Sequence, residues 1–347
     1  NQRTSGELSR KEGGKIFGEG SRATIAITLL VRKPNQSLDE KAIIYYHDIG
    51  EYLTRNDKLA KVQKMHSVLD KNIKWTILNP NVHGDWISIR NENFSILIPL
   101  AETKNNKTNQ CKVFSLNSNG VVTNRDAWAY NYSSINLSSN MGKMIDVYNK
   151  CVDRYLDDSA KNKTIKAEDY IETDETKIKW VQNLIRDLGK GIKHSFVSND
   201  VRISMYRPFC KQNLYFSKEF NWSRYLQPSI FGNKSWKNKV ICLSGVGASK
   251  PFTSLMVDNI PCLDMIEKGQ CFPLYWYEES KTRQLSLFDE NPQSEYIRHD
   301  GISNWILNEV RSRLKIKSID KEMIFYYVYG FLHSLEYRST FEADLKK

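Results

Sequence analysis

The sequence predicts a mixed α/β (α+β) fold in two parts, with a strand-rich middle and a helical C-terminal part. Short apolar runs such as Val240–Leu243 and Phe252–Val257 are long enough for buried strands and too short for helices. Met141–Leu156 and the residues after 300 instead carry apolar side chains at helical spacing. A chain of 347 residues is long enough for two packed lobes, and we expect the break between them near residues 34–50.

The N-terminal third is predicted to contain short strands around one helix. Ala23–Val31 and Ile43–Tyr46 are apolar enough for strands, and Trp75–Trp86 indicates a strand followed by a turn at its Asn-Pro-Asn and His-Gly-Asp residues. A stripe at helical spacing predicts a helix over Arg55–Leu69. The residues of this stripe are Leu59, Val62, His66 and Leu69.

The remaining elements follow from the same two periodicities. Stripes predict helices over Met141–Leu156 and over Asp174–Leu188, the second stopped by Gly189. In Val201–Tyr206 apolar and polar residues alternate, as in a strand with two different faces. Further strands are expected at Val113–Leu116, Leu214–Phe216, Val240–Leu243, Phe252–Val257 and Phe272–Tyr277. The C-terminal helices are marked by Ile302, Trp305, Ile306, Val310 and Leu314, and then by Phe325, Val328, Leu332 and Leu335.

Composition is consistent with an acidic partner, and a surface charge that only keeps the protein in solution is the other explanation. The formal net charge is +11, the sequence pI is about 9.2 and 12% of the residues are aromatic, which points first to nucleic acid and then to an acidic membrane surface. The longest apolar run, Ile25–Val31, is far too short to span a bilayer. The six cysteines form no C-x-x-C pair and the six histidines are dispersed, so we expect a reducing cytoplasm and no zinc site.

The segment from Gly245 to Pro251, GVGASKP, is the most distinctive loop of the sequence. Glycines free the backbone between two buried strands, and the exposed part holds Ser249 and Lys250. Free backbone amides, a hydroxyl and a cation together suit a phosphate oxygen. A nucleotide-binding P-loop does not fit, because a proline follows the lysine where that motif requires Ser or Thr and a helix. A structural hairpin and a clamp for the DNA backbone remain as interpretations.

Catalytic motifs are scarce. An adenine methyltransferase needs an Asn/Asp-Pro-Pro-aromatic turn to hold the flipped base, and the sequence contains no Pro-Pro pair. A metal-dependent nuclease needs an Asp followed by Glu-x-Lys, which Asp264 with Glu279-Ser280-Lys281 matches only loosely. We therefore expect that this stretch by itself is not catalytic, with residual methyltransferase or nuclease activity as the alternative.

Two clusters of residues are typical of DNA contacts. Asn124, Arg125 and Trp128 combine an amide, a fork-shaped cation and an aromatic ring in one turn, and Arg and Asn are the side chains that read guanine and adenine. A second group lies on or beside one polar strand face: Arg202, Tyr206, Arg207 and Lys211. The alternatives are a local ion pair between Arg125 and Asp126 and a simple strand end at Arg207-Pro208.

Several sequence blocks resemble the C-terminal region of type ISP restriction–modification enzymes. These blocks are TNRDAWAYNYS (123–133), RISMYRPFCKQNLYF (202–216), ICLSGVGASKPF (241–252), EKGQCFPLYWYE (267–278) and FYYVYGFLHSLEYRSTFEADLKK (325–347). The stretch GGKIFGEGSRATIAITLLVRKP (13–34) resembles the end of the adenine-N6 methyltransferase domain of that family. The resemblance covers nearly the whole chain in order.

The resemblance implies the last strands of a Rossmann-like methyltransferase in residues 1–40 and a DNA target-recognition domain in residues 41–347. It implies a bacterial or phage-encoded parent whose nuclease, ATPase and methyltransferase domains lie upstream of Asn1 or on a separate subunit. S-adenosylmethionine, ATP and Mg²⁺ would belong to those domains, so no cofactor is expected in this fragment. Duplex DNA is the expected partner, and a degenerate remnant without binding is the remaining alternative. Expected DNA contacts are Asn124, Arg125, Trp128, Arg202, Tyr206, Arg207, Lys211, Gly245, Gly247, Ser249 and Lys250.

Overall fold

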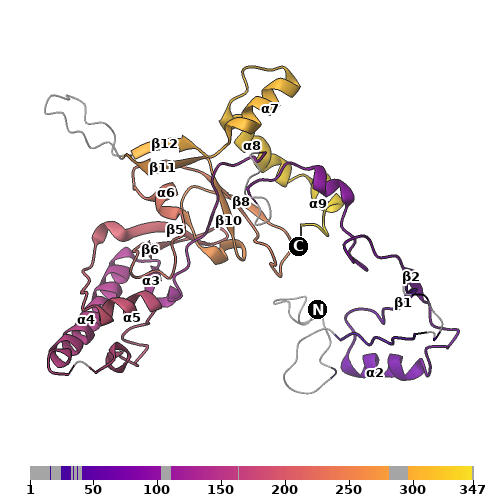
Figure 1. Cartoon of the computed structure of the whole chain (residues 1–347), viewed down its shortest axis with the longest axis horizontal. Coiled ribbons are helices and arrows are strands. Elements are labelled where there is room, and N and C mark those ends of the chain that lie inside the picture. The colour runs from indigo at the N-terminus through magenta and orange to yellow at the C-terminus, as the bar shows by residue number, and fades with distance from the viewer. Residues whose placement is uncertain are drawn as a thin grey trace. The chain divides into compact units, whose positions relative to one another are not determined.

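The chain forms two compact units, Asn1–Phe94 and Ser95–Lys347 (Figure 1). The structure is a computed structural model, and it describes residues 16, 25–32, 34, 37, 41–102, 111–162, 164–280 and 296–345. Within the described residues, no helix is long and apolar enough to cross a membrane.

The first unit is a small hairpin with one helix. Strand β1 (Ile44–Tyr46) pairs antiparallel with β2 (Thr76–Leu78), and α2 (Arg55–Lys64) lies between them in sequence. Thr54 and Asp57 begin this helix by a capping box, in which each side chain satisfies a backbone amide of the other. Of the described residues of this unit, only Asp85 is buried, so its apolar side chains form no core of their own.

Two expectations for this unit are wrong. Residues 25–31 are exposed and irregular rather than a strand, while Ala23 lies outside the described residues. Helix α2 ends at Lys64 instead of continuing to Leu69, and His66 adopts a left-handed φ of 47°. A stripe of apolar residues extends a helix mainly when it is buried, and Leu59, Val62 and Leu69 are all exposed.

The second unit contains two four-stranded sheets and a hairpin. The first sheet is antiparallel, in the order β3 (Ser118–Asn119), β10 (Gln270–Pro273), β7 (Val240–Leu243) and β8 (Ser254–Val257). The second has the order β4 (Tyr130–Asn131), β6 (Cys210–Tyr215), β5 (Val201–Arg207) and β9 (Ile260–Pro261), and only β5 and β9 run parallel. The hairpin pairs β11 (Tyr275–Glu279) with β12 (Tyr296–Asp300).

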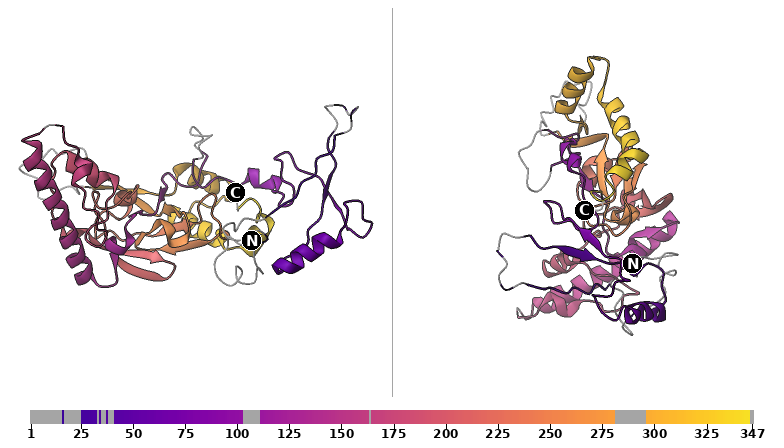
Figure 2. Two further views of the ribbon diagram at one scale, coloured as in Figure 1. Left: turned by 90° about the horizontal axis from the view of Figure 1, so that it is seen from below. Right: turned by 90° about the vertical axis from the view of Figure 1, so that its right-hand side faces the viewer.

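Three apolar clusters hold this unit together. One lies between the two sheets and includes Val121, Leu214 and Cys242. The second packs α4 (Ser134–Ser159) and α5 (Gln182–Gly189) against β6, and α4, in magenta, forms an outer face of the unit (Figure 2). The third joins the first sheet to the C-terminal helices. These helices are α7 (Asn304–Leu314), α8 (Lys321–Leu332) and α9 (Leu335–Thr340).

Short segments complete the unit. They are the helices α3 (Asp126–Ala129) and α6 (Gln227–Phe231) and the 3₁₀ turns η1 (Glu92–Ile96, which crosses from the first unit), η2 (Ala167–Tyr170), η3 (Ser198–Asp200) and η4 (Leu263–Ile266). The mixed α/β class, the predicted strands β7 and β8 and the buried stripe of α4 are confirmed.

Other details differ from expectation. Only Gln182–Gly189 of the expected helix Asp174–Leu188 is helical, although Ile178 is buried in the loop before it. Leu335 begins α9 and is 84% exposed, because the chain turns at His333 and Ser334 instead of continuing α8. The strand expected at Phe272–Tyr277 is divided at Leu274 into β10 and β11, which belong to different sheets.

The polar alternation of β5 also has a different meaning from the one expected. Ser204 is fully buried and donates a hydrogen bond to the carbonyl oxygen of Ile260 at 2.7 Å, whereas Ile203 is 48% exposed. A buried hydroxyl with a backbone partner costs little, so the parallel pairing with β9 decides which residue faces inward.

Candidate nucleic-acid interface

A group of side chains around Asp126 holds one exposed arginine in place. The Tyr206 hydroxyl donates to Oδ2 of Asp126 at 3.1 Å, and the Tyr206 ring lies 4.6 Å from the ring of Tyr130. The guanidinium of Arg207 lies 3.9 Å above the Tyr206 ring and 3.7 Å from Oδ2 of Asp126. We call Asp126, Tyr130, Tyr206, Arg207 and Cys262 the Asp126 cluster.

The Asp126 cluster presents a positive charge in a defined position. Nη1 of Arg207 donates to its neighbour's carbonyl oxygen at 2.7 Å and lies 3.4 Å from Sγ of Cys262, yet its side chain remains 39% exposed. Burial, and next the charge of Asp126, raise the pKa of Tyr206, so this hydroxyl remains a donor. An arginine held in this way matches a phosphate or a guanine edge with little further loss of side-chain freedom.

Arg125 lies inside the protein. Its exposed fraction is 3%, Nη1 lies 3.9 Å from Sδ of Met144, and the guanidinium carbon lies 6.0 Å from the centre of the Phe220 ring. Neither Nε nor Nη2 has a hydrogen-bond partner among the described residues. Burial lowers the pKa of Arg125 to about 10.

Both interpretations of Arg125 therefore need correction. The local ion pair with Asp126 is absent, since Asp126 instead binds Thr123, Tyr206 and Arg207. Direct contact with a base edge is not possible for a side chain in this buried position. Of the three predicted residues of this turn, Asn124 is exposed and has a left-handed φ of 53°. Trp128 packs against the apolar cluster that α4 and α5 form with β6.

Arg125→Met should keep or raise the stability of the protein. It removes a buried charge with two unpaired donors and keeps a side chain of similar length, so the free energy of unfolding should rise by about 0–3 kcal/mol. Thermal denaturation of the variant and the wild type at pH 7 measures this difference. A marked loss of stability would mean that the guanidinium has a partner that stabilises the native state.

The other two cations of the second predicted group have different roles. Arg202 donates to the carbonyl oxygens of Gly232 at 2.9 Å and Phe231 at 2.6 Å, and thereby caps the end of α6. Burial lowers its pKa. Lys211 is an exposed residue near the start of β6, with its ammonium 3.4 Å from Oδ1 of Asp258. The guanidinium of the half-buried Arg202 is therefore taken up by the end of α6, whereas Lys211 is exposed to a ligand.

The loop at residues 245–250, which we call the 245–250 loop, docks onto a second turn at Glu267 and Lys268. The amides of Ser249 and Lys250 donate to the Glu267 carboxylate at 2.9 and 3.1 Å, and the Ser249 hydroxyl donates to the same group at 2.9 Å. These hydrogen bonds, led by that from the Ser249 amide, lower the pKa of Glu267. The expectation of free amides is therefore wrong, because Glu267 occupies them.

The two glycines of the loop are required for different reasons: Gly247 for its backbone conformation and Gly245 for close packing. Gly247 has a φ of 73°, and its carbonyl oxygen accepts a hydrogen bond from Nζ of Lys268 at 2.8 Å. Gly245 lies so close to the second turn that a Cβ there would come within 2.1 Å of the Lys268 carbonyl oxygen. Sequence reasoning missed Glu267, since no motif joins it to residues about 18 positions away.

The Asp126 cluster and the 245–250 loop are connected through one short segment. Cys262 contacts Arg207, Glu267 binds the 245–250 loop, and η4 (Leu263–Ile266) is all that separates them in sequence. The Asp126 cluster and the loop thus depend on the same turn for their positions.

In the parts of the chain that the structure describes, no three His, Cys, Asp or Glu side chains are placed so that they could hold one metal ion. The loosely matched nuclease motif can be judged only in part, because Lys281 lies outside the described residues.

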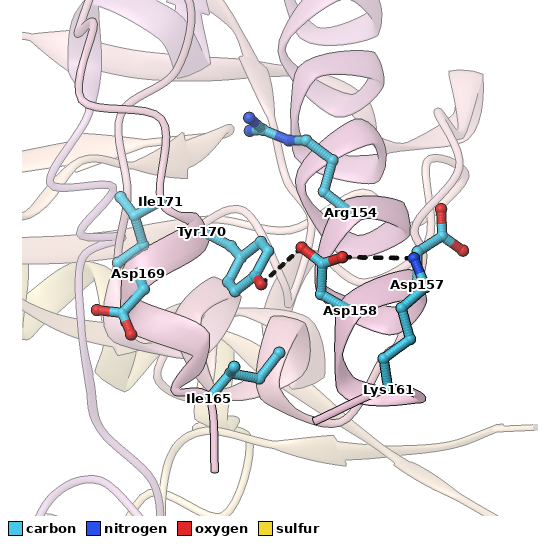
Figure 3. Close-up of a pocket in the computed structure, with 8 residues that line it drawn as sticks. All are labelled: Arg154, Asp157, Asp158, Lys161, Ile165, Asp169, Tyr170 and Ile171. Carbon is cyan, nitrogen blue, oxygen red and sulfur yellow. Dashed lines mark hydrogen bonds and ion pairs between the residues drawn. The ribbon is translucent and has the colours of Figure 1, made fainter. Parts of the chain in front are cut away.

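A hollow of about 580 Å³ lies beside α4 and η2 (Figure 3). Three carboxylates, those of Asp157, Asp158 and Asp169, line it against the two cations Arg154 and Lys161. Tyr170 donates to Oδ2 of Asp158 at 2.8 Å. Its lining carries one more negative than positive charge, which does not favour a polyanion.

Comparison with known proteins identifies the family. A search of curated proteins finds no match. The sequence matches the family described as "Type ISP C-terminal specificity domain" over residues 112–347. This match begins after the division between the two units, and the boundary expected after residue 40 remains a prediction.

Three solved structures are similar over most of the chain. A nuclease-deletion mutant of the type ISP restriction–modification enzyme LlaGI, in complex with a DNA substrate mimic, is 36% identical, with a TM-score of 0.74 over 100% of this chain. A DrdV–DNA complex is 29% identical, with a TM-score of 0.69 over 88%. The ATP-dependent type ISP enzyme LlaBIII bound to DNA is 27% identical, with a TM-score of 0.70 over 88%.

The chain spans 29%, 28% and 19% of the lengths of those three chains, respectively. The resemblance to type ISP enzymes and the mixed α/β class predicted from the apolar pattern are both confirmed. This chain belongs to the type ISP C-terminal specificity domain family.

Proposed function

We propose that this chain binds duplex DNA and selects the target sequence for a larger restriction–modification enzyme of the bacterial or phage type. Membership of a specificity-domain family carries the proposal, and the three similar proteins were each solved with DNA or a DNA mimic. The net charge of +11 favours a polyanionic partner by the release of counterions.

The exposed members of the predicted site are the proposed contacts. Arg207, held by the Asp126 cluster, and Asn124 are suited to base edges, while Lys211 and the 245–250 loop are suited to phosphates. Arg125 is buried and Arg202 is held by the end of α6, so neither is among the proposed contacts. Methyl transfer, ATP hydrolysis and cleavage would then require S-adenosylmethionine, ATP and Mg²⁺ on other domains of the parent enzyme, in the cytoplasm.

A binding-site selection with randomised duplexes tests the proposal. We expect enrichment of one sequence, bound at least about 10³-fold more tightly than unrelated duplex at moderate salt. Equal recovery of all sequences would contradict a role in target selection. Incubation with labelled S-adenosylmethionine and the selected duplex should transfer no methyl group, and incorporation above a protein-free control would favour the enzyme alternative.

A further inference from the structure

We propose that the 245–250 loop is a phosphate site that the protein itself fills with Glu267, and that a DNA phosphate exchanges with this carboxylate on binding. This inference rests on the proposed function. It adds that the Glu267 carboxylate competes with a DNA phosphate for the same hydrogen-bond donors. Three donors already converge on one anion: the Ser249 amide and hydroxyl on Oε1 and the Lys250 amide on Oε2. Carboxylate and phosphate oxygens use such donors in the same way.

The bound carboxylate can leave without dismantling the loop. Two contacts that do not involve the Glu267 side chain hold the two turns together: Gly245 N donates to the backbone oxygen of Glu267 at 3.1 Å, and Lys268 Nζ donates to the Gly247 oxygen at 2.8 Å. Ser249 and Lys250 are exposed, so an incoming phosphate can reach their amides. Only the rotation of one side chain is required.

The turn that carries Glu267 is strained. Glu267 has a φ of 36° and Lys268 a φ of 55°, and neither is a glycine. Non-glycine residues adopt this region only where surrounding contacts hold them there, and such positions are frequent at ligand sites and switches. The bonds from Gly245 N to the Glu267 backbone oxygen and from Lys268 Nζ to the Gly247 oxygen are among those contacts, and both remain when the carboxylate leaves.

Lys250 makes the exchange favourable for DNA. Its charge is next to the carboxylate of Glu267 and contributes to lowering the pKa of that group. While Glu267 is in place it neutralises part of this charge. Once a phosphate replaces the carboxylate, the Lys250 charge lies next to the phosphate and the Glu267 carboxylate is solvated. The contact between Lys250 and Glu267 is thereby exchanged for a contact between Lys250 and DNA.

Glu267→Gln separates competition from simple support. Glutamine keeps an oxygen acceptor at the same distance from the backbone but carries no charge. The loop should therefore keep its conformation, while a phosphate displaces the neutral amide more easily than the carboxylate. Measured by fluorescence anisotropy with a labelled duplex at several salt concentrations, the variant should bind about 3–10-fold more tightly, and log K against log salt should become steeper by about one unit. Lys250→Ala should then cost more affinity in the Glu267→Gln background than in the wild type.

Asp153→Asn on α4 is the matched control, because it also removes one carboxylate from an exposed lysine: Oδ1 of Asp153 lies 2.6 Å from Nζ of Lys193. It should leave the affinity within about twofold, as expected for one distant, screened charge. An equal rise in affinity for both variants, or no rise for Glu267→Gln, would overturn the exchange. Glu267 would then only hold the loop in its conformation. The melting temperature of each variant, Glu267→Ala included, identifies any loss of DNA affinity that is caused by unfolding. If the wild type binds no duplex at all, the proposed function fails instead.

Discussion

Gly245→Ala should lower the melting temperature of the protein by about 6–12 °C, the shift expected for a loss of roughly 3 kcal/mol in a unit of this size. A Cβ at this position would come within 2.1 Å of the Lys268 carbonyl oxygen and 2.7 Å of the Lys268 Cβ. Backbone oxygen cannot move aside as a flexible side chain can, so the two turns must separate. Their separation breaks the hydrogen bonds between Glu267 and the 245–250 loop.

Gly142→Ala is the matched control for this substitution. Gly142 lies inside α4, and apart from its chain neighbours and the local backbone of the helix, no atom lies within 4 Å of where its Cβ would stand. Alanine should therefore stabilise the helix by about 0.5–1 kcal/mol relative to glycine. Thermal denaturation of both variants should move the melting temperature in opposite directions. An unchanged melting temperature for Gly245→Ala would mean that the two turns are not packed together.

The double substitution Arg207→Ala and Lys211→Ala should weaken binding to duplex DNA by about 100-fold at moderate salt. A contact to a base edge contributes about 1–3 kcal/mol, and each phosphate contact adds about one unit to the salt slope. Arg207 is held by Asp126 and Tyr206, and Lys211 is exposed next to Asp258. The loss should include a changed sequence preference if Arg207 reads a base, which a repeated site selection measures.

Lys177→Ala with Lys179→Ala removes the same number of positive charges from a different part of the unit. These lysines pair with Glu172 and Glu175 in the loop before α5. We expect less than about a threefold loss of affinity, because the charges are exposed, paired and screened by salt. If both double variants lose affinity equally, binding depends on net charge, and the Asp126 cluster holds no specific contact.

The sequence by itself determined the class of the fold and the family. Apolar runs and helical stripes identified β7, β8 and α4, and the blocks from 123 to 347 identified the type ISP specificity domain. Such features are local or are read in order along the chain, so no contact between distant residues is needed to see them.

Only the tertiary structure decided what the polar residues of these elements do. Arg125, Arg202 and Arg207 look alike as sequence, yet their roles differ. Arg125 is buried, and its Nε and Nη2 have no hydrogen-bond partner among the described residues. Arg202 caps α6, and Arg207 remains partly exposed over Tyr206. The 245–250 loop looked like an open anion site until Glu267, from a distant turn, was found in it. The role of a charged group depends on its burial and on the charges and donors around it, and those come from residues far apart in the chain.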